Sequence, residues 1–415
     1  MYWLKIYIIF HGRRMWIVSL FMKPRFSRFL QRISAGVVVA CACTVQADEL
    51  NQNGVNGPAL LNDVYGRPNP QDAAMTASIA GSGVADMNIA WRSQMQRQLR
   101  SIRNRVSTLN GGIACEASLY GNKGGMQAAP SPYTFWGNAE IDRSKLDGSS
   151  HASGYSLNSI GGTAGVAMVA EEGLTVGAAF TGMHGRLGVK GYGSDASGDL
   201  DAYYGTLFAR MEQGCWEHTL IGSVGFADVS LNRRVYLPDE SYTTHGNPDG
   251  LSFGLMYEVS RSYRLNLDSV AQAWWQPVFN VSYIHSRVDS YTETGAEGAL
   301  RVGKQESNNV IFGLGARMQG IVGQNVFNAP AIMETRLLGK AITGRRDGRV
   351  NVAMPGLDDS ATVRGARQGA FGVELGMGLT IPLGKDYGSI ILDCSAEMYS
   401  DQTTVNGVLG YRFDF

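Results

Sequence analysis

The stretch Val405 to Phe415, VNGVLGYRFDF, decides how the rest of this 415-residue chain is interpreted. Side chains alternate between the two faces of a strand, so this stretch has one apolar face ending in aromatic residues and one mostly polar face, with Val408 as the exception. The apolar face carries Val405, Gly407, Leu409, Tyr411, Phe413 and Phe415. A half-buried strand of a soluble sandwich and a strand of a membrane barrel share this period, so the preceding chain has to separate them.

The same alternation recurs along residues 133–415, between clusters of polar turn residues. It predicts about twelve strands, and an even number of antiparallel strands is typical of bacterial outer-membrane barrels. The predicted strands cover 133–146, 155–169, 174–188, 200–212, 216–230, 250–261, 264–285, 306–322, 329–343, 367–381, 388–399 and 403–415.

The composition of the two strand faces favours a barrel over a sandwich. One face of residues 174–181 carries Thr175, Gly177 and Thr181, and residues 200–208 alternate Leu200 and Tyr204 with Asp201. A watery lumen accepts small polar residues, whereas a sandwich core needs large aliphatic ones. Aromatic residues near strand ends are interpreted as interfacial girdles. They are Tyr133, Trp136, Trp216, Tyr263, Trp274, Trp275, Tyr283 and Tyr399.

The connections between the predicted strands alternate in length. Short ones at 171–173, 213–214 and 384–386 are typical of the periplasmic turns of barrels. Long polar ones, expected to be external loops, cover 189–199, 231–249, 286–305 and 344–366. The predicted fold is therefore all-β: a membrane-spanning, antiparallel, up-and-down β-barrel of about 12 strands formed by residues 133–415.

Composition agrees with this fold. Charged residues are 17% of the chain, there are 53 glycines, and the formal net charge is zero. The mean hydropathy of −0.11 is too polar for a helical membrane protein. Neutral net charge together with export argues against a nucleic acid partner.

Residues 1–47 are predicted to be a signal peptide for the Sec pathway. A basic region at 23–32 precedes an apolar run at 33–45, and Val45-Gln46-Ala47 fits cleavage after Ala47. Met22 lies where such a signal would begin. Residues 1–21 are therefore either an artefact of a start codon assigned too far upstream or an N-terminal extension of the signal region. A second interpretation takes Cys41 as a lipid anchor in a lipoprotein box.

Residues 48–82 are interpreted as a short disordered lead or vestigial passenger, since Gly and Pro residues interrupt any regular structure and no repeat is present.

Residues 83–112 predict an amphipathic basic helix that begins near Asp86 and ends at Asn110-Gly111-Gly112. Its apolar stripe is Met95, Leu99, Ile102, Val106 and Leu109. Its basic residues are Arg92, Arg97, Arg100, Arg103 and Arg105. The helix is either an ordinary surface helix or one that lies in a polar barrel lumen. Residues 113–132 are a Gly-rich connector.

The sequence predicts no catalytic, cofactor-binding or metal site, and no enzyme. The histidines are scattered and no hydrolase or metalloprotease motif occurs. Gly161-Gly162 is interpreted as room for the helix rather than a phosphate loop. Cys115, Cys215 and Cys394 are too widely spaced for a disulfide framework, and one bridge between the first two stays open.

In order along the chain, several segments resemble the C-terminal translocator domain of monomeric autotransporters (type V secretion). The resemblance covers roughly residues 83–415 and includes the basic helix and the terminal aromatic strand. The segments that carry it are GGTAG at 161–165, GLTVG at 173–177, DLDAYYGTLFA at 199–209, WQPV at 275–278 and FGLGAR at 312–317.

The resemblance implies a monomeric barrel of twelve strands, with the helix in its pore, in the cell outer membrane of a Gram-negative bacterium. Tyr411, Phe413 and Phe415 would be the signal for the barrel-assembly machinery, with periplasmic chaperones and outer-membrane lipid as further partners. The implied function is to translocate or display an N-terminal segment at the cell surface. About 35 residues separate Ala47 from the helix, too few for the family's long passenger. The alternative is therefore an outer-membrane porin or adhesin-like structural barrel with no secretion role. The helix has no Asn-Asn pair, so self-cleavage by that route is not expected.

Overall fold

The structure is a computed structural model that describes residues 6–11, 14–19, 82–109, 133–148, 152–191, 194–236, 241–267, 270–295, 298–324, 330–355, 360–383 and 387–414. The chain divides into two compact units, Met1–Gly54 and Val55–Phe415. In the first, β1 (Ile6–His11) and β2 (Arg14–Ser19) pair as an antiparallel hairpin ahead of Met22. The predicted cleavage site at Ala47 and most of the lead at 48–82 lie outside the described residues.

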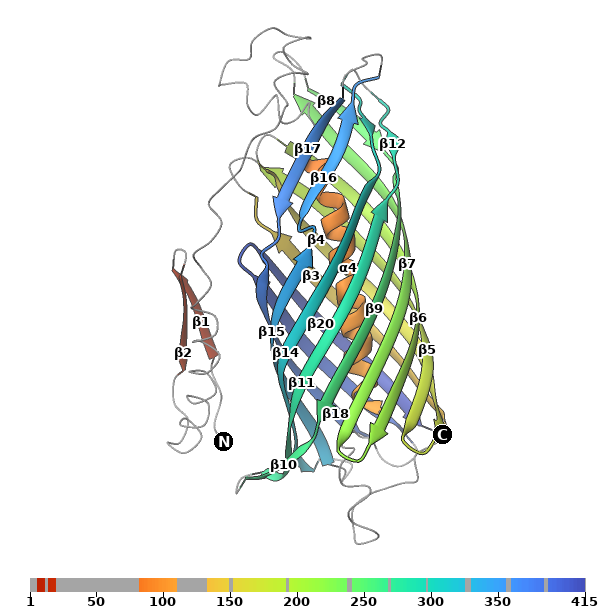
Figure 1. Ribbon diagram of the computed structural model, residues 1–415, viewed down its shortest axis with the longest axis vertical. Coiled ribbons are helices and arrows are strands. Elements are labelled where there is room, and N and C mark those ends of the chain that lie inside the picture. Colours follow the sequence, from red (N-terminus) through yellow and green to blue (C-terminus); the bar gives the residue numbers. More distant parts are fainter. Residues whose placement is uncertain are drawn as a thin grey trace. The chain divides into compact units, whose positions relative to one another are not determined.

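The second unit is a closed antiparallel barrel of 12 strands in the described part of the chain (Figure 1). Neighbours along the chain pair in order from β3 to β20, and β20 pairs with β3, which closes the ring. The strands are β3 (Tyr133–Leu146), β4 (Gly154–Glu171), β5 (Leu174–Gly191), β6 (Ser194–Gln213), β7 (Trp216–Tyr236), β9 (Asp249–Arg261), β11 (Val270–Val288), β14 (Gln305–Gln324), β15 (Pro330–Gly344), β18 (Phe371–Pro382), β19 (Ser389–Tyr399) and β20 (Gln402–Asp414). The predicted fold class is confirmed.

The barrel turns its apolar side chains outward. In β20, Val405 and Leu409 are 52% and 56% exposed, while Thr404, Asn406 and Val408 on the other face are buried. Leu207 and Leu314 are 70% and 69% exposed on other strands. An apolar exterior around a polar interior is the arrangement that a lipid bilayer stabilises, and it excludes the sandwich interpretation.

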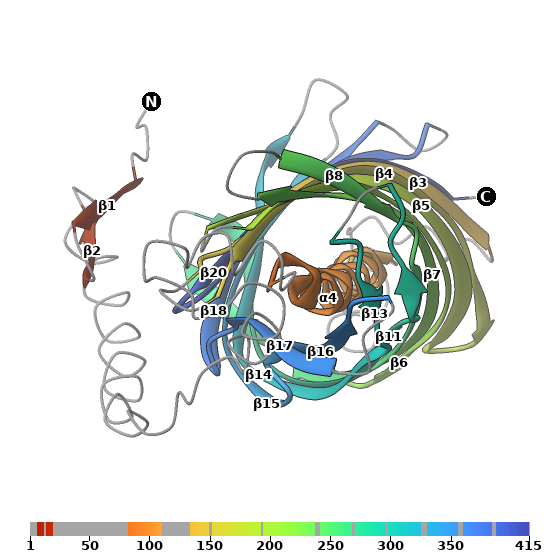
Figure 2. The same cartoon turned by 90° about the horizontal axis from the view of Figure 1, so that it is seen from above.

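One helix lies inside the barrel, as the view along the barrel shows (Figure 2). A 3-10 turn, η2 (Ser82–Asp86), leads into α4 (Met87–Val106), and all 20 residues of α4 are buried. No helix in the described part of the chain is both long enough and apolar enough to cross a bilayer. The lumen interpretation of the basic helix is therefore confirmed, and the surface-helix interpretation is wrong.

The long connections contain strands that the sequence did not predict. They are β8 (Ser241–Gly246), β12 (Tyr291–Thr292), β13 (Arg301–Val302), β16 (Asp347–Ala353) and β17 (Ser360–Arg367). β12, β13, β16 and β17 form a four-stranded sheet at the end of the barrel opposite the short turns (Figure 1). β10 (Tyr263–Leu267) extends the pairing with β11 at the short-turn end.

Candidate functional site: the helix-filled lumen

The apolar stripe of α4 packs closely against β9. Met95 and Leu99 are fully buried, and a Cβ added to Gly254 would lie 2.8 Å from Met95 Sδ and 2.9 Å from Leu99 Cδ1. At Gly250 the added Cβ would lie 3.2 Å from Trp91 Nε1. Glycine on the inner face of β9 therefore lets the helix approach the wall. The predicted pair Gly161-Gly162 does not have this role, because the atoms nearest to it belong to neighbouring strands.

Leu200 and Tyr204 point into the lumen, although they belong to the more apolar face of β6. Tyr204 is fully buried and stacks on Trp91 of α4, with ring centroids 5.6 Å apart. The outer face of the same strand carries Tyr203 and Leu207, which are 53% and 70% exposed. The rule that the more apolar face of a strand points to the lipid therefore fails for β6. The helix supplies an apolar partner inside the lumen, so the face with Leu200 and Tyr204 points inward.

Three arginines of α4 form buried ion pairs with the barrel wall. Arg97 pairs with Asp142 of β3, and Arg103 pairs with Glu374 of β18. Arg100 Nη1 lies 2.7 Å from an oxygen of Glu397 in β19. Arg103 Nε also lies 3.7 Å from a carboxylate oxygen of Glu258 in β9. Because these partners come from four separate strands, the pairs fix both the depth and the rotation of the helix.

The two remaining predicted arginines differ from these three. Arg92 is held by uncharged groups: Asn309 Oδ1 at 2.9 Å, the Arg345 carbonyl at 2.5 Å and the Gln368 side chain. Arg105 forms no ion pair with a carboxylate of the described residues, and its buried Nε and Nη2 atoms, like those of Arg97, have no hydrogen-bond partner there. A Cβ at Gly410 would lie 3.4 Å from the guanidinium carbon of Arg105. Arg105 therefore contributes charge to the lumen without a directed hydrogen bond from these two atoms.

The wall also carries a charge network of its own, which the sequence did not single out. Arg317 donates to Glu258 at 2.7 Å, Arg336 lies 2.6 Å from both Glu334 and Asp393, and Lys340 lies 2.6 Å from Glu374. Among the described wall and loop residues, the buried acids are Glu140, Asp142, Glu217, Glu258, Glu293, Glu334, Glu374, Asp393 and Glu397. The buried bases there are Arg210, Arg233, Arg317, Arg336 and Lys340. Nine acids against five bases leave an excess of four negative charges, which the five arginines of α4 offset.

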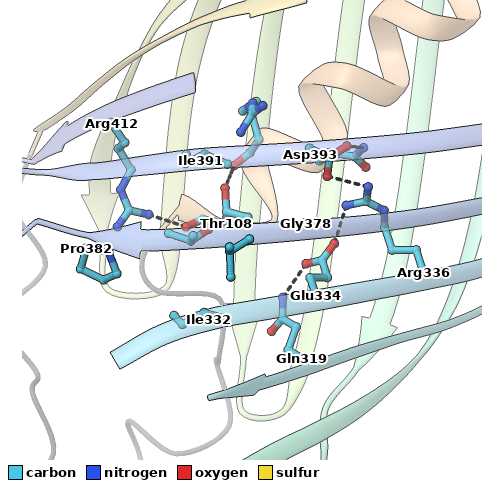
Figure 3. Close-up of a pocket in the computed structure, with 14 residues that line it drawn as sticks. Thr108, Gln319, Ile332, Glu334, Arg336, Gly378, Pro382, Ile391, Asp393 and Arg412 are labelled. Carbon is cyan, nitrogen blue, oxygen red and sulfur yellow. Dashed lines mark hydrogen bonds and ion pairs between the residues drawn. The ribbon is translucent and has the colours of Figure 1, made fainter. Parts of the chain in front are cut away.

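The C-terminal end of the helix lies at the short-turn end of the barrel, beside a cavity of about 50 Å³ (Figure 3). Arg412 donates to the Thr108 carbonyl at 2.5 Å, and Arg210 donates to the Leu109 carbonyl. These arginines satisfy carbonyls just beyond the last helical turn and favour its negative dipole end. Figure 3 also shows Arg336 between Glu334 and Asp393 on the wall of this cavity. The predicted terminator at Asn110 to Gly112 lies outside the described residues.

The N-terminal end is held by the long connections. Asp86 Oδ1 accepts a hydrogen bond of 2.8 Å from the Ala366 amide in β17, and its side chain makes no capping hydrogen bond to the helix. The helix begins at Met87, directly after Asp86, where the sequence predicts its start. Gln305 Nε2 donates to the Val84 carbonyl at 3.1 Å, and Asn88 Nδ2 donates to the Ser286 carbonyl at 3.3 Å. η2 is thus fixed where the helix meets the opening.

The predicted assembly signal lies on the outside of β20. Tyr411 and Phe413 are 44% and 37% exposed, and Tyr411 donates its hydroxyl to the Tyr387 carbonyl at 2.6 Å. Phe415 lies outside the described residues. The girdle prediction is wrong for Trp136, Trp274 and Tyr399, which are buried at 5%, 1% and 8% exposure. Each follows the parity of polar lumen residues in its own strand, a signal that was present in the sequence.

Of the two cysteines among the described residues, one takes part in a disulfide. Cys215, in the short turn before β7, is disulfide-bonded, and Cys394 is free and exposed. Cys115 of the connector, with which the sequence leaves a bridge open, lies outside the described residues. Across the described ranges, no group of three or more His, Cys, Asp and Glu side chains is placed to hold a metal ion.

Comparison with known proteins gives one family and several solved structures. The family model described as "Autotransporter beta-domain" matches residues 135–390, more than half of the chain. The translocator domain of the autotransporter NalP from Neisseria meningitidis is 12% identical, with a TM-score of 0.56 over 82% of this chain and 99% of that one. The transport unit of AIDA-I from Escherichia coli is 15% identical, with a TM-score of 0.49 over 72% and 94%. The β domain of Bordetella BrkA is 16% identical, with a TM-score of 0.49 over 68% and 100%. No curated protein sequence matches the chain significantly.

Proposed function

The chain belongs to the autotransporter family through its β-domain, and from this premise we propose that the barrel translocates or displays a short N-terminal segment at the cell surface. As a member of this family it is an outer-membrane β-barrel with the fold of a transport unit. The segment proposed to travel is residues 48–82, which would be exposed by removal of a Sec signal peptide at Ala47.

The direction of the helix is the observation that carries this proposal. Asp86, just before α4, contacts Ala366 beside the long connections, whereas Thr108, just after it, contacts Arg412 near the end of β20. A closed barrel offers no lateral exit, since every strand is paired on both sides. The N-terminal end of η2 therefore lies toward the long-connection end, which faces the cell exterior in barrels of this type.

The contacts of α4 indicate the state of the barrel once the segment has passed. Ion pairs from Arg97, Arg100 and Arg103 hold the helix in a lumen that is otherwise rich in acids. We infer that the helix then remains as a plug, so that the barrel displays its N-terminal segment without leaving an open pore. Insertion by the barrel-assembly machinery through Tyr411, Phe413 and Phe415, with periplasmic chaperones and as a monomer, belongs to the same proposal.

An epitope tag placed within residues 48–70 tests the proposal on intact cells. Detection by an added antibody without permeabilising the cells is the expected result. A tag in the connection between β16 and β17 serves as the positive control, and a tag in the turn at Gly214 serves as the negative control. A tag at 48–70 that is detected only after permeabilisation contradicts translocation and favours the porin or structural-barrel alternative.

A further inference from the structure

The outer face of the barrel carries a cluster of three aromatic rings and one arginine at the short-turn end, which we call the Arg261 cluster. It consists of Trp216 on β7, Arg261 on β9, Tyr263 on β10 and Trp275 on β11. Arg261 pairs directly opposite Trp216, and Tyr263 pairs opposite Trp275. The guanidinium carbon lies 5.2 Å from the Trp216 ring centroid and 5.1 Å from that of Tyr263, whose ring is 5.7 Å from Trp275.

Arg261 has no counter-ion among the residues that the structure describes. Its side chain is exposed, and no hydrogen bond or ion pair of its guanidinium is found among the described residues. The acids on the outer faces of β7 and β9 are Asp228 and Asp249, each 12 residues away along its strand, or roughly 40 Å. The two ring contacts fix the guanidinium but do not occupy its N–H groups as conventional donors. Its hydrogen-bonding capacity is therefore available to an external anion.

The cluster stands at the level of lipid headgroups. Trp216 is the first residue of β7 after a short turn and is 44% exposed, and Tyr263 is 41% exposed. Trp and Tyr in such positions lie at the membrane–water interface. The anion present at that level is the phosphate of a phospholipid, whose oxygens match the planar fork of a guanidinium. The neighbouring His218 already pairs with the Tyr257 hydroxyl at 2.7 Å.

We propose that the Arg261 cluster is a binding site for the phosphate of a phospholipid in the leaflet at the short-turn end. Because the rings hold the guanidinium in place before lipid arrives, less side-chain entropy is lost on binding. An anionic headgroup such as phosphatidylglycerol binds better than zwitterionic phosphatidylcholine, since no ammonium group opposes Arg261. The site would fix the height of the barrel in the membrane on the β7–β11 side.

Native mass spectrometry of the full-length barrel with phosphatidylglycerol tests the site. Arg261→Gln is expected to lower the retained lipid roughly fivefold, as about 1 kcal/mol per basic residue near an anionic surface implies. Arg287→Gln is the matched control. Arg287 lies on the same outer face of the barrel as Trp275, at the opposite end of β11, and already pairs with Asp289 at 2.5 Å. Heat-modifiable migration of each variant reports that it has folded.

One further variant and one competition measurement complete the test. Arg261→Lys keeps the charge but loses the planar fork, so its retention is expected to fall between those of the wild type and Arg261→Gln. Equal lipid retention by wild type and folded Arg261→Gln would overturn the site. Displacement of the lipid by an equal concentration of inorganic phosphate would overturn its assignment to a phospholipid.

Discussion

Replacement of Arg97 by methionine tests whether buried ion pairs hold α4 in the lumen. The Arg97 and Asp142 side chains are 4% and 1% exposed and contact each other directly. In the variant, Asp142 keeps the hydroxyl of Ser159, at 2.7 Å, as a donor but loses its counter-ion. Removing one partner of a buried ion pair costs about 3–5 kcal/mol.

That cost falls on the plugged state alone, because water solvates Asp142 once the helix leaves the lumen. It corresponds to roughly two to three and a half orders of magnitude in the equilibrium between plugged and open barrels. Single-channel recording in planar bilayers should therefore show Arg97→Met open far more often than the wild type. Adding Asp142→Asn should restore much of the plugging, since no unpaired charge then remains. Contacting residues are expected to be non-additive in this way.

Arg105→Met is the matched control, because it removes an arginine from the same helix that, unlike Arg97, forms no ion pair with a carboxylate of the described residues. Its open probability should stay near that of the wild type. If Arg97→Met opens no more often than the wild type, or if the two single variants behave alike, directed ion pairs do not hold the helix. A general effect of helix charge would then explain the plug.

Three further predictions use the same barrel. Deletion of 84–109 should raise single-channel conductance and favour cations over anions, because the remaining lumen carries an excess of four negative charges; unchanged conductance or anion selectivity would contradict this. Gly254→Leu should raise open probability by overpacking the helix contact, at about 1–3 kcal/mol, whereas Gly205→Leu, with no neighbour within 4 Å of its Cβ, should not. Deletion of Phe415 should lower the yield of heat-modifiable barrel in the membrane fraction, and a normal yield would argue against a terminal assembly signal.

Alternation along single strands was enough to predict the wall, because a lipid exterior and a polar lumen impose period two on every strand. The same parity could have corrected the girdle. Trp136 lies two and four residues from Asn138 and Glu140 and therefore shares their strand face, so its ring points into the lumen with them. Nearness to a strand end was a weaker signal than parity, since a lumen that contains a helix also accepts large aromatic rings.

The ion pairs and the extra strands could not be predicted in this way. Arg336 pairs with Asp393, 57 residues further along the chain, only because β15, β18 and β19 lie side by side at a particular register. The strand β17 likewise depends on pairing with β16 within a connection that looks merely polar in sequence. Register across neighbouring strands is set by the closed barrel as a whole, and one strand's residue pattern does not contain it.

The distribution of charge indicates that the wall does not need the helix in order to form. Arg317, Arg336 and Lys340 each have acidic partners on the wall, so most lumen carboxylates stay paired when α4 is absent. Asp142, in contrast, draws its cation from the helix. Such a barrel can close around a water-filled lumen first and accept α4 afterwards. Docking of α4 then pairs a few lumen charges, such as Asp142, and is not needed to complete a hydrophobic core. A plug held by a few buried ion pairs in a polar lumen also has modest net stability, because desolvation offsets much of the attraction. Such a helix can close the pore and still be displaced by a small change in charge.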